Sequence, residues 1–273
     1  MASIASLHIY PVKSCRGIDV ARALLTPTGL EWDRRWMIVD GKDRFVTQRE
    51  HAKLATVTTA IADGRLELSA DGHSTLVVDA RAGGARRSVR IWKDDCNGID
   101  AGDEAAAWLF RVLGGSYRLV RIDDEKPRLA NPEYAGPTPQ PVTFTDGYPV
   151  LMISRESLAE LNSRLPKPIP MARFRPSIVI EGVAPHAEDA MISFRFGNIV
   201  LRGVKHCTRC SITTTDQKNG SRDPQQEPLR TLKTYRHDRK LHGVTFGQNC
   251  ILVEGVGKTI AVGAPLTLEA HQV

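Results

Sequence analysis

The chain has 273 residues, enough to bury a full hydrophobic core in one large or two modest domains. Hydrophobic residues make up 41% of it, charged residues 25%, and the mean hydropathy is -0.25, which excludes a disordered chain, a collagen and a disulfide-stapled miniprotein. No apolar run approaches the ~18 residues of a membrane-spanning helix. Residues 1–5 lack the cationic segment and apolar stretch of a secretion signal. We therefore expect a cytoplasmic protein with no membrane partner.

The charge balance is modestly basic, with 37 lysines and arginines against 31 acidic residues and a net charge of +6. No block of five or six basic residues occurs, so we expect no nucleic-acid partner. A surplus of this size suits an anionic small ligand equally well. The five cysteines are an odd number, so at least one is a free thiol within the monomer, and we expect no disulfide framework.

The first half of the chain is predicted to be rich in β-strands. Its apolar runs are short, rich in β-branched residues and separated by turn residues such as Asp63-Gly64. The regular spacing is typical of a barrel or a sandwich. One helix interrupts this half, because apolar residues recur at the spacing of a helical face at Ala106, Leu109, Phe110 and Leu113. The predicted strands are Ser3–Tyr10, Ala55–Ile61, Leu66–Ser69, Thr75–Asp79 and Ser88–Ile91.

Five prolines between residues 126 and 141 predict an irregular crossing between two halves. A second helix follows from Ser154 to about Leu165, with Pro166 as its stop, and Gly197-Asn198 predicts a tight hairpin. The sequence therefore predicts a mainly β protein with two or three helices, divided into domains at residues 1–122 and 123–273. The strands predicted in the second half are Ser177–Glu181, Ile192–Phe196, Ile199–Val204, Ser211–Thr215, Asn249–Glu254, Thr259–Val262 and Pro265–Glu269.

The strongest local motif is a pair of cysteines three residues apart, Cys207 and Cys210, with Arg209 between them. Because a strand-like run follows, alternation would point the two thiols in different directions and favour one functional thiol over a matched pair. An adjacent arginine lowers a thiol pKa and can also bind an anion. A zinc ion shared with Cys250 and a histidine, a redox pair, and two inert buried thiols are the alternatives.

Three other segments concentrate cations where the fold alone does not require them. Lys13 lies in a loop that follows a strand and ends at a glycine, a shape suited to a phosphate. Arg34 lies between two tryptophans beside Asp33, and Arg175 lies at the entrance of a predicted strand. Each of these cations, taken alone, is more simply interpreted as a solvated surface charge. Together with Arg209, they predict a cradle for an anion.

Seven motifs in this order resemble the MOSC family (molybdenum cofactor sulfurase C-terminal domain), and the resemblance runs nearly end to end. It is closest to the branch that holds the bacterial hydroxylaminopurine-detoxifying proteins and the mitochondrial amidoxime-reducing component. The resemblance implies an N-terminal β-barrel domain packed on a C-terminal MOSC β-barrel domain, with molybdenum cofactor between them. The motifs are Tyr10–Ser14, Asp33–Trp36, Phe144–Pro149, Phe174–Pro176, Cys207–Cys210 with Thr213 and Thr214, Glu227–Arg236, and Phe246–Asn249.

The resemblance also assigns roles to single residues. It implies that Cys210 is the molybdenum ligand and the catalytic residue, a role that suits a soft thiolate. Ser177 stands where relatives usually have asparagine, which puts one hydrogen bond to the cofactor in doubt. Asp146 and Gly147 are expected on the cofactor-facing loop. The residues expected to hold the phosphate and polar edge of the pterin are Lys13, Ser14, Arg34, Arg175 and Arg209.

The activity implied by the resemblance is the two-electron reduction of an N–O bond in N-hydroxylated compounds such as hydroxylaminopurines and amidoximes. The bacterial relatives usually continue into a C-terminal ferredoxin domain, whereas this sequence ends at Val273. We therefore expect electrons to come from a separate protein of the ferredoxin or flavin reductase type. The alternative is a carrier of molybdenum cofactor or of sulfur, in which Cys210 bears a persulfide or the site stores cofactor.

Overall fold

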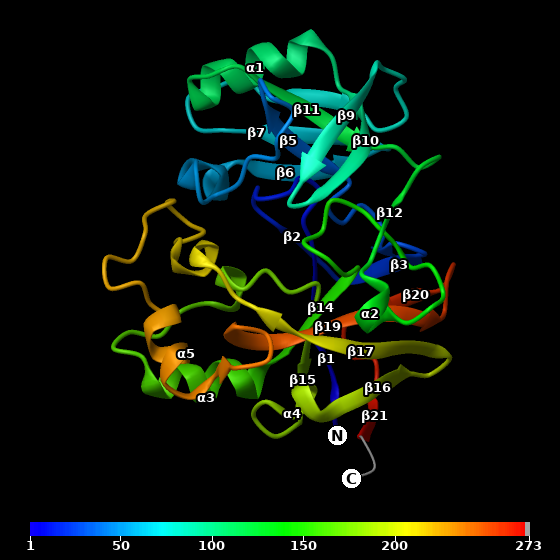
Figure 1. Ribbon diagram of the computed structural model, residues 1–273, viewed down its shortest axis with the longest axis vertical. Coiled ribbons are helices and arrows are strands. Elements are labelled where there is room, and N and C mark those ends of the chain that lie inside the picture. Colours follow the sequence, from blue (N-terminus) through cyan, green and yellow to red (C-terminus); the bar gives the residue numbers. More distant parts are fainter. Residues whose placement is uncertain (271–273) are drawn as a thin grey trace.

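The computed structural model describes residues 1–270, and most of its regular structure is β. A large sheet forms the lower half of the molecule in Figure 1, and smaller sheets with helix α1 form the upper half. The mainly β fold expected from the sequence is confirmed. No helix of residues 1–270 is long and apolar enough to cross a membrane.

The large sheet has nine strands within the described residues, in the order β2-β1-β15-β14-β19-β17-β16-β21, with β18 paired to β19. Strand β1 runs antiparallel to β15, so the N-terminal segment pairs with residues about 170 positions away. Leu7, Met152 and Phe194 are buried in one core beneath this sheet. The strands are β1 (Ser3–Ile9), β2 (Ile18–Val20), β14 (Val150–Ser154), β15 (Ile178–Glu181), β16 (Met191–Phe196), β17 (Ile199–Thr208), β18 (His237–Asp238), β19 (Gly243–Glu254) and β21 (Thr267–Ala270).

A three-stranded sheet adds the next N-terminal segment to the same core. Strand β20 (Thr259–Ala261) pairs with β3 (Arg22–Thr26), which pairs with β4 (Gly29–Leu30). Leu25 and Leu30 are buried in the core that Leu7 and Phe194 share. Residues 3–30 therefore pack with the second half of the chain, although the division at residue 122 stays a prediction.

The upper half contains two antiparallel sheets and the helix α1 (Asp103–Leu113). Trp36 and Trp108 are fully buried between them. The sheet β5-β11-β10-β9 consists of β5 (Trp36–Asp40), β11 (Tyr117–Ile122), β10 (Asp94–Asp100) and β9 (Arg86–Ile91), and the sheet β6-β7-β8 of β6 (Thr58–Ala62), β7 (Arg65–Ser69) and β8 (Leu76–Asp79).

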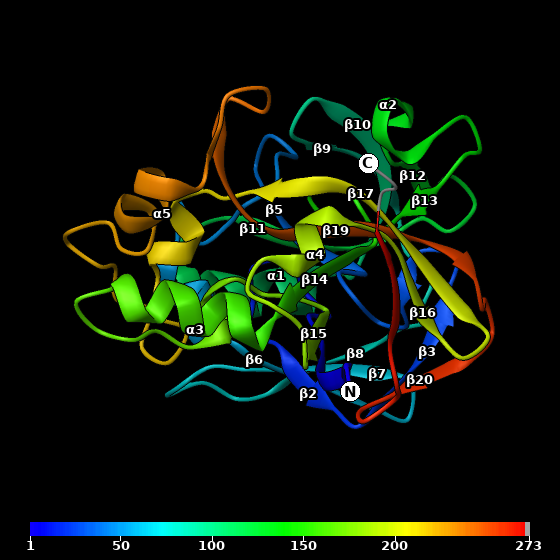
Figure 2. The same ribbon diagram turned by 90° about the horizontal axis from the view of Figure 1, so that it is seen from below.

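The proline-rich crossing has little regular structure, as expected: the two-residue strands β12 (Arg128–Leu129) and β13 (Pro141–Val142) flank the one-turn helix α2 (Pro132–Ala135). Helix α3 (Arg155–Arg164) begins after Ser154, whose hydroxyl caps it by accepting from the Ser157 N–H. Helix α5 (Leu229–Tyr235) lies beside α3 on one flank of the large sheet, as both views show (Figures 1 and 2). The short helix α4 (Ala187–Ala190) precedes β16.

Three local expectations were wrong. Ser211–Thr214 forms the 3-10 helix η3 instead of a strand, because the Cys210 carbonyl accepts from both the N–H and the hydroxyl of Thr213. Ala55–Ile61 starts inside another 3-10 helix, η1 (Ala52–Thr56), and only its second part belongs to β6. In α1, Phe110 is 61% exposed, because the buried face runs through Ala105, Trp108, Leu109 and Val112.

Candidate functional site

A cavity of about 1180 Å³ is lined by residues from both halves of the chain. It gathers every residue that the sequence singled out for the site. Eight lysine and arginine side chains line it against three carboxylates, so the cavity is strongly electropositive. The predicted residues on its wall are Lys13, Ser14, Arg34, Asp146, Gly147, Arg175, Ser177, Arg209 and Cys210.

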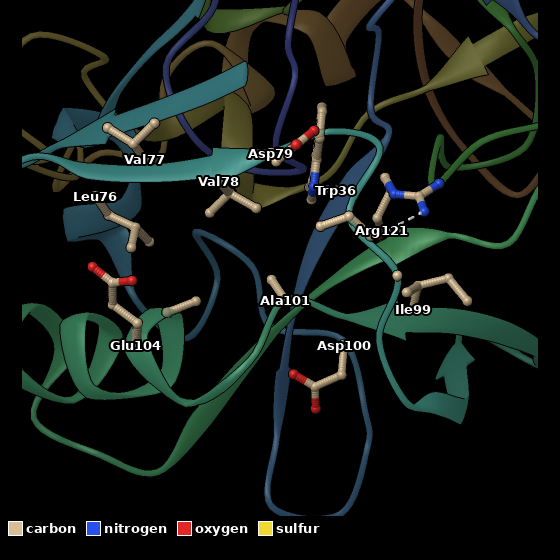
Figure 3. A pocket seen from close by; sticks show the side chains of 13 residues that line it. Trp36, Leu76, Val77, Val78, Asp79, Ile99, Asp100, Ala101, Glu104 and Arg121 are labelled. Carbon is tan, nitrogen blue, oxygen red and sulfur yellow. Dashed lines mark hydrogen bonds between the residues drawn. The ribbon is translucent and has the colours of Figure 1, made fainter. Parts of the chain in front are cut away.

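A smaller cavity of about 120 Å³ lies in the upper half between the β8 end and α1 (Figure 3). Apolar side chains such as Leu76, Val78 and Ile99 surround much of it, and the buried indole N–H of Trp36 has no hydrogen-bond partner there. None of the predicted site residues lines it. The chemistry of the chain therefore concentrates in the large cavity.

Lys13 and Asp146 form an ion pair across the cavity. The Lys13 Nζ donates to Asp146 Oδ1 at 2.7 Å and to the Phe144 carbonyl at 2.9 Å. The backbone N–H of Lys13 donates to the Trp36 carbonyl, which fixes the loop against β5. Burial lowers the pKa of Lys13, and the Asp146 carboxylate opposes that shift. Burial also acts to raise the pKa of Asp146, but the Lys13 ammonium and its hydrogen bond outweigh it and hold that pKa well below its usual range.

Arg34 is held in place by a buried network. Its guanidinium donates to the Asp33 carboxylate, to Ser177 Oγ at 3.0 Å and to the Arg175 carbonyl at 2.9 Å. The Ser177 hydroxyl in turn donates to Asp33 Oδ2 at 3.1 Å. Ser177 is fully buried, so its hydroxyl is committed to this network. The serine at this position therefore orients Arg34, both directly and through Asp33.

Arg175 lies beside Arg34 and has unused hydrogen-bonding capacity. Both guanidinium groups lie 4.2 Å from the centre of the Tyr10 ring. Arg175 is buried, and its Nη2 has no hydrogen-bond partner within the described residues. Burial lowers the pKa of Arg175 to about 10, and the neighbouring Arg34 adds to this. A buried cation with an unpaired donor is a binding point for an anion.

Arg209 lies between the two cysteines of the motif. Its Nη1 donates to Cys207 Sγ at 2.9 Å and its Nη2 to the Phe174 carbonyl at 2.6 Å. Its Nε is buried and has no partner in residues 1–270. Cys210 ends the segment after β17 and begins η3, and both cysteines line the cavity. The strand alternation expected for Cys207 and Cys210 is therefore wrong, because the chain leaves the sheet at Thr208.

The remaining cysteines lie in the cores. Burial raises the pKa of Cys15 to about 12 and that of Cys96 to about 11, and it also raises the pKa of Cys250. The thiols of Cys207 and Cys210 are half-buried. Among the cysteines, these two are the accessible thiols.

Comparison with known proteins identifies the family of the chain. The MOSC N-terminal beta barrel domain matches residues 1–116, and the MOSC domain matches residues 139–267. The chain is 35% identical over 284 aligned positions to human mitochondrial amidoxime-reducing component 1, covering 98% of this chain and 83% of the relative. This chain belongs to the MOSC family. Rat mitochondrial amidoxime reducing component 2 is 34% identical over 247 positions, covering 86% of this chain and 73% of the relative.

The residues of this MOSC protein fit an anionic cofactor that brings its own metal. On the cavity wall, Arg175 Nη2 and Arg209 Nε are buried guanidinium nitrogens without hydrogen-bond partners in residues 1–270, and the cavity has room for an organic molecule. No three His, Cys, Asp or Glu side chains of residues 1–270 gather as a metal site. The donor that this part of the chain offers to a soft metal is a thiol next to cationic groups, as Cys210 is.

Sequence reasoning missed two features of the cavity of this MOSC protein. Arg128 is buried and donates to the carbonyls of Thr143 and Thr145, which anchors the loop that carries Asp146. Trp92 lines the cavity from the turn between β9 and β10. Neither lies in a motif, and Trp92 is joined to the rest of the cavity wall by its hydrogen bond to Asp146, 54 residues away.

Proposed function

We propose that this MOSC protein is a molybdenum-cofactor-dependent reductase of N-hydroxylated compounds. The observation that carries the proposal is the convergence of Cys210, Arg175 and Arg209 on one electropositive cavity, with two buried guanidinium nitrogens left without partners. The resemblance to two amidoxime-reducing components supports the reaction class. Five free thiols within residues 1–270 support a reducing compartment, and we propose the cytoplasm.

The proposal gives each residue a part in holding the cofactor. Arg175 Nη2 and Arg209 Nε would donate to its phosphate, since charge-assisted hydrogen bonds to phosphate are the strong ones. Cys210 would supply the thiolate that ligates the metal. Lys13 and Ser14 would bind the polar edge of the pterin from the N-terminal half, with Asp146 and Gly147 beside them on a loop of the C-terminal half. When bound, the cofactor would supply two-electron redox chemistry coupled to the transfer of an oxygen atom.

The reaction must balance two electrons and two protons. The N–OH compound gains two electrons and two protons, its N–O bond breaks, and it leaves as the N–H compound and water. A separate electron-transfer protein would supply the electrons. Lys13 is the ammonium on the cavity wall with a lowered pKa, and burial is the cause of that shift. A lysine of this kind can return a proton to a product more readily than an ordinary one.

The test is an activity assay on protein made in a host that synthesises molybdenum cofactor. Chemically reduced methyl viologen replaces the unknown donor, and conversion of benzamidoxime to benzamidine is followed by chromatography. We expect turnover in the wild type and its loss in Cys210→Ser. Protein that carries cofactor but reduces neither benzamidoxime nor 6-hydroxylaminopurine would instead be a cofactor carrier. Protein that binds no cofactor would contradict both functions.

A further inference from the structure

One wall of the cavity is made of aromatic rings and a cation. We define the aromatic wall as Phe45, Arg49 and Trp92, all of which line the cavity. The rings of Phe45 and Trp92 lie 5.0 Å apart at 53°. The Arg49 guanidinium lies 4.3 Å from the centre of the Trp92 ring and 5.6 Å from that of Phe45. The three side chains therefore form one packed group.

Trp92 is a half-exposed residue in a left-handed turn on the cavity wall. It is 44% exposed and has a φ of 57°, a left-handed value that is costly for a bulky residue. A tryptophan side chain usually stabilises a fold by burying its apolar surface, and this ring leaves much of that surface exposed. Its exposed ring, in a strained turn on the cavity wall, is available to contact a ligand.

The position of Trp92 is fixed from the other half of the chain. Its indole N–H donates to Asp146 Oδ1 at 3.1 Å, and the same oxygen accepts from Lys13. Arg49 is fixed as well, because its Nε donates to Thr47 Oγ1 at 3.2 Å. The wall is thus held before any ligand arrives, which lowers the entropy cost of binding.

We propose that the aromatic wall binds the planar, conjugated part of the substrate, so that this protein prefers aromatic and heteroaromatic N-hydroxylated compounds over alkyl ones. This inference rests on the proposed function. A ring conjugated to an amidoxime or a hydroxylamino group is flat and has a π face for Trp92. The Arg49 guanidinium is a planar cation that stacks on the same kind of face. An alkyl group offers neither contact.

The test compares benzamidoxime with acetamidoxime, which carry the same reacting group. We expect Trp92→Leu to lower the ratio of their kcat/KM values, aryl over alkyl, about two- to tenfold, the value of one aromatic contact. Trp92→Phe retains a ring and is expected to preserve most of the preference. Phe110→Leu is the matched control, because Phe110 is a 61% exposed aromatic residue that does not line the cavity, and its ratio is expected to equal that of the wild type.

Two further readouts keep the inference separate from the proposed function. Molybdenum and pterin content are expected to be unchanged in Trp92→Leu, and a loss of cofactor would overturn the inference by placing the wall in cofactor binding. An unchanged ratio would overturn it directly. If the wild type reduces neither amidoxime nor 6-hydroxylaminopurine, the proposed function fails, and quenching of tryptophan fluorescence by benzamidoxime then tests the wall alone. Quenching in the wild type but not in Trp92→Leu would support it, and no quenching in the wild type would overturn it.

Discussion

Replacing Asp33 with alanine is expected to destabilise the protein by about 3–5 kcal/mol, the cost of breaking a buried ion pair by removing one partner. The Asp33 side chain is fully buried and that of Arg34 is 13% exposed, so solvent screens little of the pair. The carboxylate also accepts from the Tyr10 N–H at 2.8 Å and from the Ser177 hydroxyl. Asp33→Ala removes all three bonds and leaves the Arg34 charge uncompensated.

The assay is urea denaturation of the cofactor-free protein, analysed as a double-mutant cycle with Arg34→Met. Because removing the arginine also removes the uncompensated charge, the double variant is expected to lose at least about 1 kcal/mol less than the sum of the two single variants. Asp33→Asn is the isosteric control, which retains the acceptor for the Tyr10 N–H. A loss below about 1 kcal/mol in Asp33→Ala, or strict additivity in the cycle, would refute the reasoning.

Three further predictions concern thiols, backbone and pH. Ellman's reagent is expected to titrate two thiols, Cys207 and Cys210, in the folded cofactor-free protein and all five after unfolding; a third reactive thiol before unfolding would contradict the burial of the others. Gly247→Ala is expected to lose about 2 kcal/mol more stability than Gly257→Ala, because both have φ near 80° but only the first would place a Cβ 2.5 Å from a neighbouring side chain; equal denaturation midpoints would contradict this. Burial raises the pKa of Tyr10 to about 12, so between pH 10 and 12 the folded state holds the proton that the unfolded state loses, and stability falls as the pH rises; Tyr10→Phe is expected to lessen that fall by up to about 1.4 kcal/mol per pH unit, and parallel urea midpoints from pH 9 to 11 would count against it.

Local sequence patterns predicted the helices and turns that local interactions, such as turn residues and helix caps, determine. The hairpin at Gly197 formed as expected, and α3 begins directly after Ser154, where the helix was predicted to start. The predicted strand at Ser211–Thr215 was wrong because a side chain there hydrogen-bonds to the nearby backbone and competes with strand pairing. Thr213 belongs to a β-branched run, yet its N–H and hydroxyl both donate back to the Cys210 carbonyl and wind the chain into η3.

The members of the site could be predicted from motifs, but their partners could not. Lys13 and Asp146 were both expected at the cofactor, and the ion pair between them depends on loops 133 residues apart. Ser177 lines the cavity and stays a predicted cofactor contact, and no motif indicates that its hydroxyl also bonds to Arg34 and Asp33. Trp92 lies in no motif, and its place on the cavity wall depends on a hydrogen bond to Asp146, 54 residues away.

The central claim is that the sulfur of Cys210 ligates a metal whose anionic carrier is held by Arg175 and Arg209. Its most direct test is the molybdenum and pterin content of protein purified from a cofactor-producing host, with Cys207→Ser as the matched control on the same cavity. The account predicts stoichiometric molybdenum in the wild type and in Cys207→Ser, and its loss in Cys210→Ser with the denaturation midpoint of the cofactor-free protein unchanged. Full molybdenum content in Cys210→Ser, or its loss in Cys207→Ser instead, would contradict the account.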